Sequence, residues 1–300
     1  YSVKRAAGIL GLGRAGVFPI PVDERFRLRP EALPATFELA ERAGRRVFAV
    51  VASAGSTSTG AFDPLEPVAE FCRQRGLWFH VDGAHGAAAV LSPKYAHLAA
   101  GMGRADSVVW DAHKMMLLPA LLTAVLFRDS RRSYEAFSQR ADYLLRQHAH
   151  GEWWNPAHRT LECTKRMMGF ELWAALALHG TRMFSDYVTR MFDLGRTFAA
   201  MLDDADDFEL AVAPDCNIVC FRHVPPDYES LDAHQERIRA RLIAEGSFYL
   251  VQTRLRGQVH LRVTLINPLT SEADLEALLA AIRRAAEPDR EDDRDEHLGD

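Results

Sequence analysis

The run Leu77-Trp78-Phe79-His80-Val81-Asp82-Gly83-Ala84-His85-Gly86 opens the stretch that decides the fold, and Asp106-Ser107-Val108-Val109-Trp110-Asp111-Ala112-His113-Lys114 closes it. Each run begins as a short apolar strand and ends in polar residues that packing alone does not require. The first strand leads to Asp82 and the second to Lys114. Because ligands bind at the carboxyl ends of strands in open α/β sheets, we expect this acid and this amine in one crevice.

The segments before these runs predict the same architecture. Arg46 to Ala52 is a valine-rich apolar run, typical of a strand buried on both faces. A loop of small residues follows over 53–60, and Asp63-Pro64 together with Gly76 predicts a helix over 64–75. The alternation of strands and helices predicts an α/β fold with a parallel or mostly parallel sheet and right-handed crossovers.

The acid and the amine indicate a cofactor. Pyridoxal phosphate needs a lysine for its aldehyde and a carboxylate for its pyridine nitrogen. Lys114 follows a buried-looking strand and precedes the apolar run 115–119, which argues against a surface lysine. Asp82 on its own is equally well explained as a helix cap or turn aspartate. Paired with Lys114, it predicts a pyridoxal-phosphate site.

These boxes resemble the group II pyridoxal-phosphate decarboxylases, the family of glutamate, cysteine-sulfinate and aromatic amino-acid decarboxylases. The marks are His80 to Gly86, the Asp111-Ala112-His113-Lys114 box and the glycine-rich run Ala54 to Ala61, and the similarity extends from Tyr1 to about Arg284. The resemblance implies a fold-type I, pyridoxal-phosphate transferase-like large domain with a mostly parallel sheet and a smaller α+β C-terminal domain.

The resemblance and the composition together divide the chain into three parts. Residues 1–160 are expected to form part of the large domain, and residues 161–286 the connecting helices and the small domain. Helices are predicted from 159 towards 179 and from 182 to 202, followed by strand 217–222, helix 234–245, strands 248–253 and 259–265, and a last helix. Ser271-Glu272-Ala273-Asp274 has the form of a capping box for that helix. The charged residues 287–300 are predicted to be a disordered tail.

The start of the chain bears on activity. Tyr1 is not a methionine, and a helix is predicted from Ser2 to Leu12. In the resembled family this point lies after a loop that cups the phosphate and a histidine that stacks on the ring. We therefore expect the chain to be the C-terminal part of a longer enzyme, with an inactive fragment or regulatory subunit as the alternative.

The resemblance places several residues around the cofactor. Lys114 holds it covalently, Asp82 pairs with its ring nitrogen, and Ala84 packs against the ring. His113 is expected near the phosphate or the lysine linkage, although a histidine that bonds backbone is the alternative. Asp111 stands where several relatives have an asparagine near the phosphate. We assign it no role, because a carboxylate beside a phosphate is unfavourable.

Two hydroxyls and two departures from the family pattern concern the expected cofactor and substrate site. Ser56 and Thr57 are expected to reach the cofactor's phenolic oxygen or a substrate carboxylate, although hydroxyls in such loops often only form turns. The chain has Gly83 where the family usually has alanine, and His85 where an aromatic residue is common. We therefore place His85 at the substrate pocket.

Two more residues complete the expected site. Tyr143 lies 29 residues after Lys114 (143 − 114), in the polar segment 130–155, where a relative's tyrosine returns a proton to the substrate's α-carbon. Arg262 interrupts the apolar strand Val259 to Val263, and a buried arginine needs an anion. The family reading is the substrate α-carboxylate, and the alternative is an internal salt bridge.

The predicted activity is that of a carboxy-lyase, namely decarboxylation of an L-amino acid. Lys114-Met115-Met116 and Glu162 to Arg166 are closer to the glutamate-decarboxylase side, which favours an acidic or small polar substrate. The alternatives are a 2,4-diaminobutyrate or aromatic amino-acid decarboxylase and a decarboxylating aldehyde synthase. The family also implies a homodimer with a shared active site.

Composition excludes other classes. The chain has 300 residues, of which 48% are apolar and 26% charged, as in ordinary globular proteins. A formal charge of −5 gives no reason to expect nucleic acid or an anionic membrane, and no apolar run approaches the ~20 residues that cross a bilayer. Four cysteines (Cys72, Cys163, Cys216 and Cys220) form no CxxC pair, so we expect reduced thiols, a cytoplasmic location and no metal.

Overall fold

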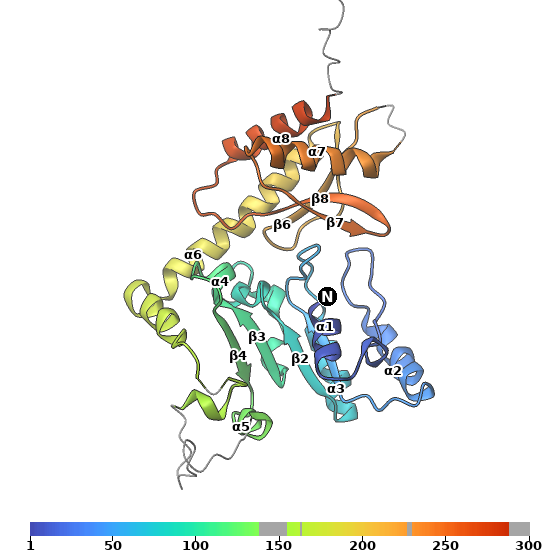
Figure 1. Cartoon of the computed structure of the whole chain (residues 1–300), viewed down its shortest axis with the longest axis vertical. Helices are drawn as coiled ribbons and strands as arrows, with labels where there is room; N and C mark the ends of the chain where they lie inside the picture. Colours follow the sequence, from blue (N-terminus) through green and yellow to red (C-terminus); the bar gives the residue numbers. More distant parts are fainter. Residues whose placement is uncertain (138–154, 163, 227–229, 288–300) are drawn as a thin grey trace, which may run out of the picture. The chain divides into compact units, whose positions relative to one another are not determined.

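The computed structural model describes residues 1–137, 155–162, 164–226 and 230–287 (Figure 1). These fall into two compact units, Tyr1–Arg190 and Met191–Asp300, which are considered separately. The division lies inside one helix, α6 (Gly169–Asp203).

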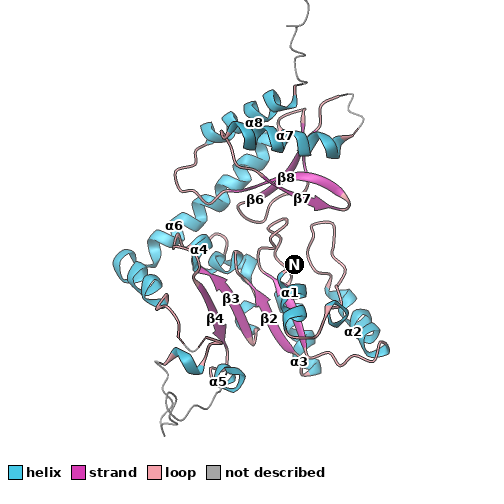
Figure 2. Cartoon of the chain, viewed as in Figure 1, coloured by secondary structure: helices cyan, strands magenta, loops and turns pink. Residues whose placement is uncertain are grey.

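The first unit contains a four-stranded sheet in its described part (Figure 2). The strands are β1 (Ala49–Ser53), β2 (Trp78–Asp82), β3 (Ser107–Asp111) and β4 (Thr123–Phe127), in that spatial order. The first three are parallel, and β4 runs antiparallel to β3. The α/β prediction with a mostly parallel sheet is confirmed, and the parallel strands all end at one edge.

Helix α3 (Leu65–Arg75) shows how local sequence signals produce this arrangement. Pro64 precedes its first turn, and Gly76 ends it in the left-handed conformation with φ 62°, which glycine adopts without a Cβ clash. The buried residues Leu65, Val68 and Cys72 recur at helical spacing on one face, and the helix packs against β1 and β2. This crossover helix thereby positions two strands whose ends reach the site.

The remaining elements of the first unit are short. Helix α4 (Ala112–Met115) joins β3 to the segment before β4, and the short helix η6 (Pro156–His158) precedes α6. A positive φ of 67° at Gly180 interrupts α6, at the point between the two helices predicted from the sequence. The other elements are α1 (Ser2–Ile9), η1 (Arg14–Gly16), η2 (Pro30–Ala32), α2 (Leu33–Arg42), η3 (Gly86–Leu91), η4 (Ala96–Ala99), η5 (Met102–Arg104), α4 (Ala112–Met115), α5 (Arg131–Phe137) and η6 (Pro156–His158).

The second unit is an antiparallel sheet with helices packed against it. Its elements are β5 (Phe208–Leu210), β6 (Ile218–His223), α7 (Leu231–Glu245), β7 (Val251–Leu255), β8 (Gln258–Thr264) and α8 (Glu272–Ala286), with the strands in the order β5-β6-β8-β7. The two helices pack against each other, and α7 packs on β8. The predicted capping box is formed, because the Asp274 N–H donates to the Ser271 hydroxyl and the Ser271 N–H donates to the Asp274 carboxylate.

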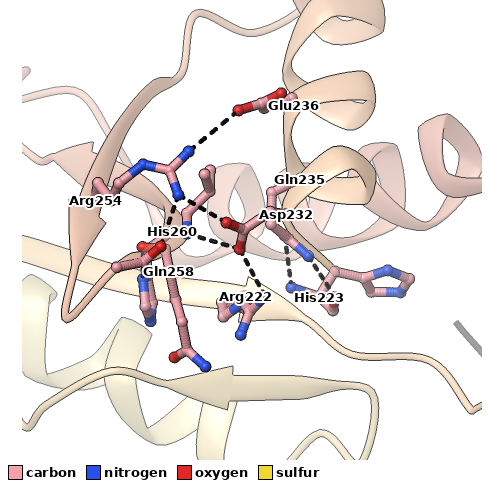
Figure 3. Close-up of polar contacts among 10 residues, drawn as sticks. Arg222, His223, Asp232, Gln235, Glu236, Arg254, Gln258 and His260 are labelled. Atoms are coloured by element: carbon pink, nitrogen blue, oxygen red, sulfur yellow. Dashed lines mark hydrogen bonds and ion pairs between the residues drawn. The ribbon is translucent and has the colours of Figure 1, made fainter. Parts of the chain in front are cut away.

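Asp232, in the first turn of α7, joins that helix to the sheet (Figure 3). Its Oδ1 accepts from the Val259 N–H at 2.9 Å and from Arg222 Nη2 at 3.2 Å, and its Oδ2 accepts from Arg254 Nη1 at 2.8 Å. Arg254 also lies 3.7 Å from a Glu236 oxygen. The pKa of Asp232 is lowered, first by the Val259 N–H and then by the two guanidinium groups, against a burial effect that raises it.

A chain of polar groups with two buried histidines at its centre runs through the same unit. Arg237 Nη2 lies 3.0 Å from His234 Nδ1, His234 Nε2 lies 2.9 Å from His223 Nδ1, and His223 Nε2 lies 3.3 Å from Asp207 Oδ2. Arg283 donates twice to the Asp207 carboxylate, each time at 2.7 Å. Because an arginine only donates and a carboxylate only accepts, both histidines are neutral and carry their proton on Nε2.

Candidate active site

Four backbone hydrogen bonds join the loops that follow β1, β2 and β3. The Ala54 N–H donates to the Asp82 carbonyl at 2.8 Å, and the Gly86 N–H donates back to the Ala54 carbonyl at 3.0 Å. The Gly83 N–H donates to Val109 O and the Asp111 N–H to Ala84 O, each at 3.1 Å. The three strand ends therefore form one continuous surface at the carboxyl edge of the sheet.

Glycine is required at this surface because the loops approach each other closely. A Cβ on Gly86 would lie 2.5 Å from the Ala54 carbonyl oxygen and 2.5 Å from Phe62 Cζ. One on Gly83 would lie 2.8 Å from Ala87 Cβ and 3.1 Å from Val109 O, so the alanine usual in the resembled family does not fit here without a shift. Gly55 has φ 79°, and its Cβ would lie 2.9 Å from the Gly86 nitrogen. The close approach of neighbouring atoms therefore accounts for glycine at these three positions, and at Gly55 the positive φ favours glycine as well.

Asp82 ends β2 as the sequence predicts, and its side chain is half-buried. One carboxylate oxygen accepts from the Ala84 N–H at 3.2 Å, which holds the group at the strand end. The other accepts from the Ser2 hydroxyl of α1 at 3.3 Å, in an exposed contact. Among the described residues, the second oxygen accepts a hydrogen bond from this exposed hydroxyl alone.

Lys114 lies in α4, directly beyond the end of β3. Its neighbours Met115 and Met116 are buried, and Met116 packs with Ala112, Leu122 and Phe184 in an apolar cluster. The lysine side chain remains about one-third exposed. The backbone beneath the amine is therefore fixed by packing, while the amine itself is accessible.

The amine of Lys114 has a partner that the sequence reasoning did not assign. Its Nζ lies 2.8 Å from Asp111 Oδ2, and Thr123 on β4 donates to Asp111 Oδ1 at 2.6 Å. Burial raises the pKa of the Asp111 carboxyl, but the bonds from Lys114 and Thr123 outweigh it, so the net pKa is lowered. The spacing Asp-x-x-Lys was the available signal, since residues three apart on a helical turn face each other.

His113 is held by backbone on one side and faces the acid on the other. Its Nδ1 lies 2.9 Å from the Leu122 carbonyl and 3.2 Å from the Leu122 nitrogen. Its Nε2 lies 3.7 Å from Asp111 Oδ2. The backbone-bonding alternative for this histidine is therefore observed, although its second nitrogen stays beside the Asp111–Lys114 pair.

The other predicted residues of the first unit lie in the joined loops. Ser56 Oγ is 3.0 Å from Thr59 Oγ1, a hydrogen bond inside the loop, and Thr57 is exposed. Ala84 is half-buried beside Asp82. His85 is buried at 7% exposure, a position that gives it little surface for a ligand.

Two predicted residues do not belong to the described part of the first unit. Tyr143 falls outside the residues that the structure describes. Arg262 belongs to the second unit, on β8, where its Nε is buried without a hydrogen-bond partner and burial lowers the pKa of the guanidinium. Within the described ranges no carboxylate pairs with it, so the internal salt bridge considered for Arg262 is not observed there.

The residues present fit pyridoxal phosphate. Asp82 ends β2 and Lys114 follows β3, and these two strands are hydrogen-bonded neighbours. An accessible amine on a packed turn and a carboxylate whose outer oxygen has only an exposed partner supply the two required groups. Among the described residues no His, Cys, Asp and Glu cluster has the makings of a metal site, and no described helix is long and apolar enough to cross a membrane.

Comparison with known proteins agrees with this chemistry. Residues 1–224 match the family model described as the pyridoxal-dependent decarboxylase conserved domain. The chain therefore belongs to the pyridoxal-dependent decarboxylases, and the family and the cofactor predicted from the sequence are confirmed.

Two relatives and one solved structure show how similar the chain is to known decarboxylases. The chain is 32% identical to the mouse (Mus musculus) acidic amino acid decarboxylase GADL1, over 94% of this chain and 54% of the relative. It is 32% identical to mouse cysteine sulfinic acid decarboxylase, over 94% of this chain and 60% of the relative. The crystal structure of mouse CSAD superposes with a TM-score of 0.88 at 30% identity, covering 96% of this chain and 62% of that one. The chain thus spans between half and two thirds of these relatives.

Proposed function

We propose that this chain takes part in the pyridoxal-phosphate-dependent decarboxylation of an acidic L-amino acid, yielding the amine and carbon dioxide. The observation that carries the proposal is Lys114, an accessible amine on a packed turn next to the strand that ends in Asp82. The acidic substrate is supported by the names of the relatives, one an acidic amino acid decarboxylase and the other a cysteine sulfinic acid decarboxylase.

Each residue contributes according to its contacts. Bound pyridoxal phosphate supplies an electron sink for the pair of electrons left when carbon dioxide departs. Lys114 would hold the aldehyde, and Asp82, oriented by the Ala84 N–H, would keep the ring nitrogen protonated. Ala84 would back the ring, where only a small side chain leaves room for it.

The remaining assignments rest on the family resemblance. Ser56, Thr57 and His113 would border the cofactor, and His85 the substrate. Arg262 would bind the substrate's α-carboxylate, a role supported by a buried guanidinium nitrogen without a partner. We further propose a homodimer with a shared active site and a cytoplasmic location.

Labelling of the lysine tests the cofactor assignment. The protein is incubated with pyridoxal phosphate, reduced with borohydride and digested, and the peptides are analysed by mass spectrometry. The pyridoxyl mass should fall on Lys114, and Lys114→Ala should abolish both label and carbon dioxide release. Lys94→Ala, which removes an exposed lysine of the same unit, should leave both intact. Label on Lys94 or Lys165 would overturn the assignment.

A substrate panel tests the reaction. Aspartate, glutamate and cysteine sulfinate are offered alongside tryptophan and 2,4-diaminobutyrate, and carbon dioxide, amine and aldehyde are measured together. We expect amine and carbon dioxide in equal amounts from an acidic substrate. Aldehyde with ammonia as the main product would instead establish an aldehyde synthase, and turnover of tryptophan alone would exclude the acidic substrate.

The proton donor is tested by Tyr143→Phe. The change removes the hydroxyl and keeps the ring, so attachment of the cofactor to Lys114 should persist. Amine formation should fall by ~10²–10⁴-fold, the usual contribution of a positioned general acid. Unchanged amine turnover would remove Tyr143 from the mechanism.

A further inference from the structure

Asp111 carries two strong contacts on one carboxylate. Thr123 Oγ1 donates to Oδ1 at 2.6 Å, and Lys114 Nζ lies 2.8 Å from Oδ2. The carboxylate side chain is only 13% exposed, whereas that of the lysine is 36% exposed. The acid is therefore the more buried member of the pair and is held from the neighbouring strand β4, whereas the lysine is the more exposed member.

This ion pair limits the ability of the Lys114 amine to attack an aldehyde. Lys114 can attack a carbonyl carbon only with a free electron pair on Nζ, and a cation held at 2.8 Å by a mostly buried carboxylate does not offer one. Bond formation therefore requires the ion pair to open and the ammonium to give a proton to solvent. The Nζ pair then bonds to the aldehyde carbon, and the aldehyde oxygen, after taking up protons, leaves as water.

We propose that Asp111 is a positioning residue that holds the Lys114 ammonium in this ion pair whenever the lysine is not bonded to the cofactor. We call the Asp111–Lys114 ion pair the latch. The proposal rests on the proposed function, because it takes Lys114 as the cofactor lysine. Thr123 serves the latch by directing the carboxylate, since a hydroxyl bonded to Oδ1 leaves Oδ2 facing the amine.

A rival explanation places the charge of Asp111 against the cofactor's phosphate. A carboxylate near a phosphate dianion repels it, so removal of the charge would favour every ligand that carries the phosphate. The two explanations differ for pyridoxal, which has the aldehyde and lacks the phosphate. The latch acts on the lysine and is indifferent to the phosphate, whereas repulsion disappears when the phosphate is absent.

The test measures how fast Lys114 is attached to each aldehyde. Parent chain and variants are mixed with pyridoxal or with pyridoxal phosphate, quenched with borohydride at intervals, and the pyridoxyl mass on the Lys114 peptide is followed. Asp111→Asn should accelerate attachment about five-fold with both aldehydes, the factor that corresponds to about 1 kcal/mol for a partly exposed ion pair. Thr123→Val should accelerate both by a smaller common factor.

The control is Asp129→Asn, which removes one negative charge from an exposed acid paired with Arg131 and should leave both rates unchanged. A variant that merely loosened the turn around Lys114 would slow attachment, so acceleration separates the latch from a structural effect. Acceleration with pyridoxal phosphate alone would establish phosphate repulsion and overturn the latch, as would equal or slower rates in Asp111→Asn. Absence of label on Lys114 in the parent would overturn the cofactor assignment itself, and the latch with it.

Discussion

The buried histidine pair of the second unit predicts that this unit loses stability in mild acid. His234 and His223 are linked through Nε2 and Nδ1 at 2.9 Å, between Arg237 at one end and Asp207 at the other. An added proton on either ring would place N–H against N–H, or against the guanidinium. Burial, followed by repulsion from His223 and Arg237, accordingly lowers the pKa of His234 to about 4. Burial also lowers the pKa of His223, although Asp207 acts in the opposite direction.

The sign and size of the effect follow from that pKa. Because the unfolded chain has the ordinary histidine value of about 6.5, it binds more protons than the folded chain between pH 6.5 and pH 4. The contribution to the free energy of unfolding is fully present above pH 6.5 and is lost as the pH falls through this window. The difference between a pKa of about 6.5 and one of about 4 corresponds to at most about 3.4 kcal/mol. We expect about 1–2 kcal/mol, because the partners relax when the ring is charged.

Hydrogen exchange measured on the whole chain resolves the effect by unit. Peptides covering β6 and α7 should lose protection as the pH is lowered from 7 to 4.5, after correction for the intrinsic exchange rate. His234→Gln removes the titrating ring, so its protection should be lower at pH 7 and should change less with pH. His97→Gln, which alters an exposed histidine of the first unit, should keep the parent's pH profile. The reasoning is refuted if His234→Gln and the parent lose protection in parallel.

Three further predictions concern local packing. Gly86→Ala places a Cβ 2.5 Å from the Ala54 carbonyl oxygen and should lower the free energy of unfolding, measured by urea titration, by about 1–3 kcal/mol. The control Gly103→Ala has no atom within 4 Å of the added Cβ and should change the free energy of unfolding by no more than about 0.5 kcal/mol. An equal effect of the two substitutions would contradict the close loop contact. Burial raises the pKa of Cys216 and of Cys220 to about 12, so both thiols should resist iodoacetamide at pH 8 in the native protein and react in urea. Rapid native labelling would show that β6, or the segment just before it, is accessible. Ser271→Ala removes one half of the capping box and should cost about 1 kcal/mol, with exchange increased in the first turn of α8, while unchanged exchange there would mean that the cap contributes little.

Much of the architecture followed from local signals. Gly76 and Ser271 define helix ends through backbone conformation and short-range hydrogen bonds, and the helices α3 and α8 form where these signals predict them. The break at Gly180 falls between the two helices predicted over 159–179 and 182–202. Such interactions join residues only a few positions apart, so their partners can be read in the sequence itself.

The site was predictable to the extent that its residues end strands. Asp82 and Lys114 carry no contact with each other that a sequence can show, but parallel strands place their carboxyl ends at one edge. Strand order alone therefore brought the acid and the amine to the same surface. The assignment of pyridoxal phosphate needed no knowledge of distances.

Contacts between residues far apart in the sequence were decided only by the tertiary structure. The approach of Gly86 to Ala54, the anchoring of Asp111 by Thr123 on an antiparallel β4, and the partnerless Nε of Arg262 all depend on which backbone passes beside which. Local signals were sufficient for the type of many elements and for ends such as those at Gly76 and Ser271, because hydrophobic periodicity and capping act over a few residues. The helix predicted from residue 159, which has no such start signal, begins instead at Gly169. Packing between elements settled the other side-chain pairs, because contacts such as Thr123–Asp111 at 2.6 Å and His234–His223 at 2.9 Å form only once separate elements lie side by side.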